Sequence, residues 1–272
     1  MPLVLDPPLF DHVPDIRLIA VDMDGTLLDD EKAIHDDFWP LLDALSDRGI
    51  VLCPASGRQY AALRGQIGRP ELVYVAENGA YVVRDEVELS SETLDLAEAR
   101  AVIRALRSAE RLDVGAVLCG KRSAYTERAD ERFLAEMRPY YARLEQVDDL
   151  LVVEDEILKV AVLDFGLVDE GAGPVLAGFP GAVVSGKHWV DVMNPIADKG
   201  LALRHVQDVL GVTRGQTMAF GDYFNDVGLL DAAEWSFAMD NAHPEVRAHA
   251  RFVAPANTAN GVVRTIRSVL GI

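Results

Sequence analysis

The chain has 272 residues and a formal net charge of −18, which argues against nucleic acid and anionic membranes as partners, because both are bound by basic surfaces. Apolar residues make up 50% of the chain and charged residues 26%, as in a globular protein of one or two domains, and no uncharged apolar run is long enough to span a membrane. The opening residues also lack the features of a secretory signal, so we expect a cytoplasmic protein.

The first 80 residues predict alternating strands and helices. Four prolines favour a surface arm over residues 1–15. The apolar run that follows, 18–21, predicts a buried strand. The next predicted elements are a helix over 38–49, a strand over 50–53, a helix over 58–67 and a strand over 72–76. Their short connections predict a parallel sheet with right-handed crossovers.

The pattern of predicted strands and helices changes over residues 81–188. Short alternating runs at 81–83 and 86–89 predict a hairpin, and the apolar spacing over 99–106 predicts a helix. Further expected elements are strands over 114–118, 157–164 and 182–184 and helices over 130–137 and 168–177. We interpret this segment as an inserted α+β cap domain, built as a sheet with helices on one face.

From residue 189 the parallel rhythm returns. A helix is expected to open at Lys199, capped by Asp198, and to stop at Gly211. The remaining expected elements are a strand over 216–220, a short helix over 227–230, a strand over 236–239 and a helix over 262–270. The predicted fold class is α/β: a Rossmann-like, doubly wound parallel sheet core made of 1–80 and 189–272, with the α+β cap of 81–188 inserted between its halves.

Polar residues gather where the predicted core strands end. Asp22 and Asp24 follow the first buried strand, and a bound cation would offset the cost of two carboxylates there, although an ordinary Asp/Gly turn is an equally good interpretation. Ser56 follows the second strand, and Asp222 follows the strand over 216–220. The carboxyl ends of parallel strands share one edge of an open sheet, so these segments can converge.

Taken together, these segments resemble the haloacid dehalogenase superfamily of phosphatases. The stretches similar to its four motifs, in the same order, are Asp22-Met23-Asp24-Gly25-Thr26, Ser56-Gly57-Arg58, Lys199 and Gly221-Asp222-Tyr223-Phe224-Asn225-Asp226. Within the superfamily the chain is similar to the Cof-type phosphatases, which carry a large αβ cap between the second and third motifs. The resemblance covers nearly the whole chain.

This resemblance implies a role for each motif residue. Asp22 is the implied nucleophile, which forms an aspartyl-phosphate, and Asp24 is the implied general acid and base. Mg²⁺ is the implied cofactor, with Asp22, the Asp24 carbonyl and Asp222 as ligands and Asp226 in support. The residues implied to contact the phosphoryl group are Thr26, Ser56 (through its hydroxyl and backbone N–H), Gly57, Arg58, Asn225 and the catalytic Lys199.

Plainer interpretations stay open for some of these residues. Lys199 could be a solvated lysine at a helix start, and Asn225 with Asp226 could be a helix cap. Arg58 could simply pair with a nearby carboxylate. The motif order favours the functional interpretation of Lys199 and of Asn225 with Asp226.

The sequence thus predicts a Mg²⁺-dependent phosphatase that acts on a small phosphorylated metabolite, with a sugar phosphate as the expected class. The alternatives are a sugar phosphomutase and a catalytically silent binding protein of the same fold, whereas a dehalogenase has no need of Asp24. Four cap residues could reach the substrate, although exposed surface is the plainer position for each: Arg122, Tyr125, Lys187 and His188. The sequence predicts neither the particular ester nor the oligomeric state.

Overall fold

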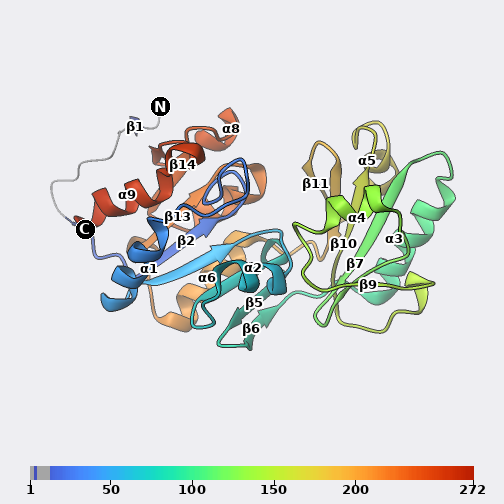
Figure 1. Cartoon of the computed structure of the whole chain (residues 1–272), viewed down its shortest axis with the longest axis horizontal. Helices are drawn as coiled ribbons and strands as arrows, with labels where there is room; N and C mark the ends of the chain where they lie inside the picture. The colour runs from blue at the N-terminus through green and yellow to red at the C-terminus, as the bar shows by residue number, and fades with distance from the viewer. Residues whose placement is uncertain (1–2, 5–12) are drawn as a thin grey trace.

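A computed structural model describes residues 3–4 and 13–272, whose strands form two sheets (Figure 1). The larger sheet has the strand order β1-β15-β14-β13-β2-β3-β4-β5-β6. Neighbours from β1 to β4 pair in parallel, whereas β5 and β6 are antiparallel to the strands before them. The strands are β1 Leu3–Val4, β2 Leu18–Asp22, β3 Val51–Ala55, β4 Val73–Ala76, β5 Tyr81–Arg84, β6 Val87–Ser91, β13 Thr217–Gly221, β14 Trp235–Met239 and β15 Phe252–Ala254.

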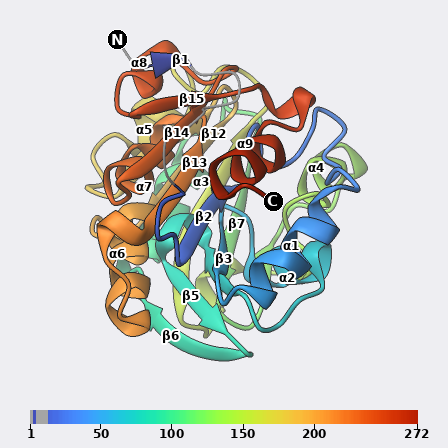
Figure 2. The ribbon, with the colours of Figure 1, turned by 90° about the vertical axis from the view of Figure 1, so that its left-hand side faces the viewer.

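Helices cover both faces of this sheet, as Figure 2 shows. One face carries α1 Phe38–Asp47, α2 Tyr60–Ile67, α8 Pro244–Arg247 and α9 Gly261–Leu270, and the other carries α6 Lys199–Leu210 and α7 Val227–Asp231. Because both faces are covered, the central strand β2 is fully buried, which explains its unbroken apolar run. The expected α/β class with a Rossmann-like core is therefore confirmed.

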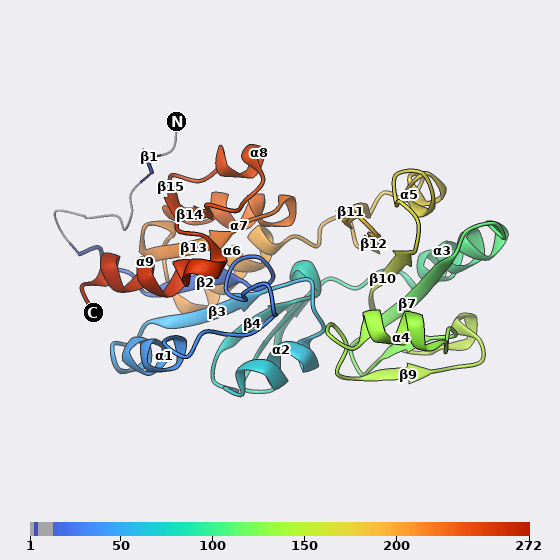
Figure 3. The ribbon, with the colours of Figure 1, turned by 45° about the horizontal axis from the view of Figure 1, so that its top comes forward.

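The smaller sheet has the order β11-β12-β10-β7-β8-β9 and lies beside the larger one, reached by two passages of the chain (Figure 3). Its strands are β7 Val114–Gly120, β8 Ala124–Thr126, β9 Leu144–Gln146, β10 Ile157–Asp164, β11 Ala182–Gly186 and β12 Trp189–Met193. Its helices are α3 Leu96–Ser108, α4 Glu131–Met137 and α5 Ala172–Leu176. We call residues 92–193 the small-sheet module and the rest of the described chain the large-sheet module.

The small-sheet module differs from its prediction in two ways. Helices α3 and α5 pack on one face, but α4 packs on the other face through Phe133 and Met137, so the helices do not share one face. The helix expected over 168–177 is shorter, because its first residues form turns before α5 begins at Ala172.

The change of sheet also falls at residues other than the predicted boundaries of 80/81 and 188/189. The expected hairpin forms as β5 and β6, but it continues the larger sheet, because β5 pairs with β4. Strand β12 pairs with β10 and β11 and so belongs to the smaller sheet. Strand pairing therefore places the two passages just after Ser91 and just after Met193.

The start of helix α6 agrees with its prediction. The Asp198 carboxylate accepts hydrogen bonds from the backbone N–H groups of Gly200 and Leu201, each at 2.9 Å, and Gly211 closes the helix with φ of 64°. This cap holds Lys199 in the first turn of α6.

Most of the arm expected over 1–15 lies outside the described residues; of it, β1 pairs with β15 at the edge of the larger sheet. Within residues 3–4 and 13–272, no helix combines the length and apolar character needed to cross a bilayer.

Candidate active site

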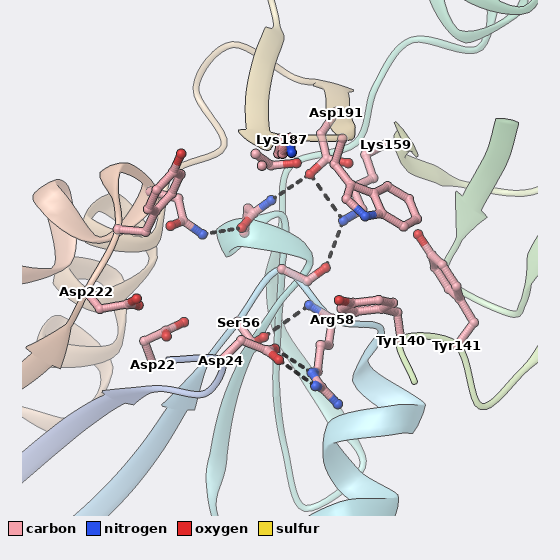
Figure 4. A pocket seen from close by; sticks show the side chains of 17 residues that line it. Asp22, Asp24, Ser56, Arg58, Tyr140, Tyr141, Lys159, Lys187, Asp191 and Asp222 are labelled. Carbon is pink, nitrogen blue, oxygen red and sulfur yellow. Dashed lines mark hydrogen bonds and ion pairs between the residues drawn. The ribbon is translucent and has the colours of Figure 1, made fainter. Parts of the chain in front are cut away.

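Four adjacent strands of the larger sheet, β13, β2, β3 and β4, end at one edge. The residues at or just past these ends are Asp222, Asp22, Ser56 and Glu77. Asp222, Asp22 and Ser56 border a cavity of about 340 Å³ that both modules line (Figure 4). The expected convergence of distant segments at this edge is therefore what the fold produces.

Three carboxylates crowd together beneath this cavity. Asp22, Asp222 and Asp226 each offer an oxygen within 4.8 Å of the other two. Lys199 Nζ lies 2.7 Å from Oδ1 of Asp22 and 2.7 Å from Oδ1 of Asp226, and its side chain is fully buried. The interpretation of Lys199 as a solvated lysine is therefore wrong.

This crowding changes the acidity of the cluster. Burial, then the negative charge of Asp226, raises the pKa of Asp22 well above its ordinary value, against the opposing charge of Lys199. The same two causes raise the pKa of Asp222 to about 7. Burial lowers the pKa of Lys199, but the charges of Asp22 and Asp226 outweigh it and raise that pKa overall. One ammonium thus faces three carboxylates.

The donor set fits a hard divalent cation. Carboxylate oxygens are preferred ligands of Mg²⁺, and two oxygens on opposite sides of such an ion are about 4.2 Å apart, given bonds of about 2.1 Å. The oxygens of Asp22, Asp222 and Asp226 lie within 4.8 Å of one another, which is close to that span. A cation there would also relieve the repulsion that raises the pKa values of Asp22 and Asp222.

Asp226 organises the loop that carries Asp222. Its Oδ2 accepts the backbone N–H groups of Asp222 and Tyr223 at 3.0 and 3.2 Å, while its Oδ1 is held by Lys199. Both oxygens are thus occupied within the protein. This arrangement fits the supporting role expected for Asp226.

The turn after β2 is shaped to admit Asp222. Gly25 has φ of +81°, and a Cβ at this position would lie 2.4 Å from Oδ2 of Asp222. A side chain is therefore excluded there on both backbone and packing grounds. Thr26, expected to contact phosphate, donates its hydroxyl to Oδ1 of Asp222 at 3.3 Å.

Asp24 is held by two cations. Arg58 donates two hydrogen bonds to its carboxylate, from Nε at 2.6 Å and from a terminal nitrogen at 2.7 Å, and Lys32 Nζ lies 2.9 Å away. Burial alone would raise the pKa of Asp24, but the bonds and charge of Arg58 outweigh it and lower that pKa. The plainer interpretation of Arg58, as the partner of a carboxylate, is thus what the structure shows.

The turn after β3 presents a hydroxyl rather than the backbone N–H of Ser56. That N–H donates to the carbonyl of Val75 at 2.8 Å, so its expected contact with phosphate is wrong in this structure. Ser56 Oγ instead accepts the N–H of Arg58 at 3.2 Å. A hydroxyl that accepts one bond keeps its own proton for another acceptor in the cavity.

Several residues that border the cavity were not predicted. Asn78, with φ of 57°, donates its amide to Oδ2 of Asp191 at 3.1 Å and accepts the amide of Asn225 at 3.1 Å. Lys159 and Asp191 come from β10 and β12 of the small-sheet module. The missed signal was a charged residue inside each of two otherwise apolar strand runs, since such charges are rarely buried without partners.

Of the four cap residues expected to reach a substrate, Lys187 lines the cavity, together with Tyr140, Tyr141 and Trp189. Arg122 and Tyr125 instead contact Asp155 and line a separate depression, and His188 bonds the carbonyl of Gly166. The structure therefore brings Lys187 to the site but not the other three.

Known proteins with similar sequences agree with this geometry. Residues 19–266 match the family described as haloacid dehalogenase-like hydrolase. The chain therefore belongs to the haloacid dehalogenase-like hydrolases, and the predicted enzyme class, a phosphatase of this superfamily, is confirmed.

Individual relatives span almost the whole chain. A 5-amino-6-(5-phospho-D-ribitylamino)uracil phosphatase of Escherichia coli (strain K12) is 34% identical over 269 residues, which cover 94% of this chain and 96% of the relative. A pyridoxal phosphate phosphatase of the same organism is 26% identical, with 93% and 98% covered. The solved structure of SMU.1108c from Streptococcus mutans UA159 has a TM-score of 0.85 at 25% identity and covers 94% of this chain and all of that one.

Proposed function

We propose that the protein is a Mg²⁺-dependent phosphatase that hydrolyses a small phosphorylated metabolite through an aspartyl-phosphate on Asp22. The observation that carries this proposal is the single cluster of Asp22, Asp222, Asp226 and Lys199 at the end of β2. A nucleophilic carboxylate needs positive charge beside it to approach an anionic phosphate. Mg²⁺ held by Asp22, the Asp24 carbonyl and Asp222 would supply that charge when bound.

The first chemical step belongs to Asp22. Its carboxylate attacks phosphorus, the bond from phosphorus to the ester oxygen breaks, and a proton from Asp24 passes to the leaving oxygen. Lys199 keeps the Asp22 carboxylate oriented and adds charge near the phosphoryl oxygens. The Ser56 hydroxyl, Gly57 and Asn225 contact those oxygens from the side of the cavity.

The second step releases phosphate. Asp24 takes a proton from water, the water oxygen attacks the phosphorus of the aspartyl-phosphate, and the Asp22 carboxylate leaves. To act as the acid of the first step, Asp24 must hold a proton, and its contacts with Arg58 and Lys32 oppose that. Both cations must therefore release Asp24 when substrate binds, which would leave Arg58 free to contact the phosphoryl group.

The small-sheet module would act as the cap of this site. It contributes the flat rings of Tyr140, Tyr141 and Trp189 to the cavity wall, together with the charged Lys159, Lys187 and Asp191. Such a wall can bind the leaving alcohol and keep water away. The names of the relatives refer to phosphorylated small molecules, which supports a substrate of that kind here, with sugar phosphates still the class expected from the sequence. A cytoplasmic location is also kept as part of this proposal.

The test is a screen of small phosphate esters with Mg²⁺, including p-nitrophenyl phosphate. We expect turnover by the unaltered chain, none after chelation of divalent metal, and recovery when Mg²⁺ is returned. Asp22→Asn should lower kcat by about 10⁴-fold or more, whereas Asp47→Asn, on the exposed end of α1, should not. Metal-independent turnover, or an active Asp22→Asn variant, would remove the proposal.

The same screen addresses the sugar phosphomutase. An aspartyl-phosphate can be returned to a sugar hydroxyl instead of water. Isomerised product from a hexose phosphate, without release of inorganic phosphate, would replace the phosphatase by the mutase.

A further inference from the structure

A buried lysine joins the two modules at the phosphate-binding turn. Lys159 projects from β10 of the small-sheet module, and its side chain is only 4% exposed. Its Nζ donates to the carbonyl of Gly57 at 2.8 Å. It also lies 3.0 Å from Oε2 of Glu77 in the large-sheet module. Its distance to Oδ2 of Asp191 on β12 is 3.6 Å (Figure 4).

The Lys159 side chain keeps its positive charge. Burial lowers the pKa of Lys159, but the charges of Asp191 and Glu77 outweigh it and raise that pKa above the ordinary value. A buried ammonium is costly unless it is paired and hydrogen-bonded. Lys159 keeps its hydrogen bond and its closer ion pair only while the small-sheet module is seated on the large-sheet module, because Glu77 and the Gly57 carbonyl lie on the other side of the interface.

The contact with Gly57 reaches the proposed phosphate site through one peptide unit. The carbonyl of Gly57 and the N–H of Arg58 belong to the same rigid plane. Lys159 holds the carbonyl end, and the N–H end donates to Oγ of Ser56 at 3.2 Å. Rotation of this peptide would break both bonds and free the Ser56 hydroxyl to turn away from the cavity.

The turn has further support from Asn78, whose backbone N–H donates to the carbonyl of Ser56 at 2.9 Å. Asn78 packs so tightly against Gly57 that a Cβ there would lie 2.9 Å from its Oδ1. Asn78 in turn bonds Asp191, the second carboxylate near Lys159. The orientation of the Gly57–Arg58 peptide is thus tied to the seating of the small-sheet module.

We propose that Lys159 is a positioning residue, which gives the Ser56–Gly57 turn its phosphate-binding shape when the small-sheet module is seated. This inference rests on the proposed phosphatase function and goes beyond it. A residue of the cap would control the affinity for phosphate, rather than the recognition of the leaving group. Inorganic phosphate has no leaving group, so its binding isolates that effect.

The experiment measures the inhibition constant of inorganic phosphate against p-nitrophenyl phosphate at saturating Mg²⁺. Lys159→Met should raise that constant and the KM about tenfold or more, the loss expected for one bond to a charged group. Lys121→Met is the matched control, because Lys121 also pairs across the modules, with Glu88 at 3.0 Å, but its ammonium pairs with Glu88 and Glu156 rather than with the Ser56–Gly57 turn. It should leave both constants within about twofold.

A second variant distinguishes weaker phosphate binding from a folding defect. Lys159→Met leaves two buried carboxylates without their cation, whereas Lys159→Met with Glu77→Gln removes one charge of each sign and keeps the net charge of the cluster. The double variant should fold more stably and still bind phosphate about tenfold more weakly. If Lys159 were merely structural, its replacement would lower the melting temperature and leave the inhibition constant of phosphate for the folded enzyme unchanged. That result in either variant would overturn the inference. Absence of turnover by the unaltered chain would instead remove the proposed function.

Discussion

Lys199 Nζ lies 2.7 Å from Oδ1 of Asp22, although 177 positions separate the two residues in the chain. The small-sheet module occupies most of that interval, so the site is assembled from both ends of an interrupted sheet. Two local features make the contact possible: the cap by Asp198 fixes Lys199 in the first turn of α6, and β2 ends at Asp22.

The first prediction concerns the space that Gly25 leaves for Asp222. Gly25→Ala would place a Cβ 2.4 Å from Oδ2 of Asp222 at a φ of +81°. We expect kcat/KM and Mg²⁺ affinity to fall at least tenfold. Gly49→Ala is the matched control, because Gly49 has φ of +69° but open space around its Cβ. It should cost only the backbone strain of about 1–2 kcal/mol in the free energy of unfolding. Equal effects on activity would show that Asp222 does not need this space.

The second prediction concerns the pair of Arg58 and Asp24. The pKa of Asp24 is lowered, so its contribution to stability is present above the ordinary value of 3.8 and is lost as pH falls through the lower folded value. Arg58→Met should lower the free energy of unfolding at pH 7 by about 2 kcal/mol, because burial then raises the pKa of Asp24. This loss of unfolding free energy should become smaller as pH falls toward 4, because Asp24 then takes up a proton.

Urea unfolding at several pH values measures this loss. Lys32→Met is the comparison, since the Lys32 side chain is 46% exposed whereas that of Arg58 is 6% exposed. Its effect should stay within about 1 kcal/mol at every pH. If the loss of unfolding free energy in Arg58→Met does not change with pH, lost packing rather than the lost ion pair explains it.

The third prediction concerns Asp222 in the metal-free protein. Burial and Asp226 raise its pKa from 3.8 to about 7. A raised folded value means that its favourable contribution is present below pH 3.8 and is lost as pH rises through about 7. In a chelator, the melting temperature of the unaltered chain should therefore fall relative to that of Asp222→Asn between pH 5 and pH 8. Saturating Mg²⁺ should abolish that relative fall. A difference between the two chains that is constant with pH would contradict the shift.

Much of the fold was predictable because the periodicity of apolar residues is local. Strand β10 occupies the predicted span of 157–164, and α9 forms over the predicted stripe. The sheet to which a strand belongs depends on distant partners. The alternation in β5 and β6 therefore predicted a hairpin but not its pairing with β4.

The residues of the site were likewise predictable only in part. Asp22, Lys199 and Asp222 were predictable because each sits at an element end in a recognisable motif. Lys159 and Asp191 were not, since a charged residue in a strand reveals nothing of its partner across the module interface, which is Glu77 for Lys159 and Asn78 for Asp191. The bond of the Ser56 N–H to Val75 likewise depends on the register of β3 beside β4.

Asp22 and Asp222 are expected to share one divalent ion. Diffraction from crystals soaked in Mn²⁺, a divalent ion that accepts the same oxygen ligands, tests it most directly through anomalous scattering. A shared ion should give one strong peak within bonding distance of a carboxylate oxygen of Asp22 and one of Asp222, and this peak should be lost in Asp222→Asn. A peak elsewhere, with none between these two residues, would show that they do not share an ion.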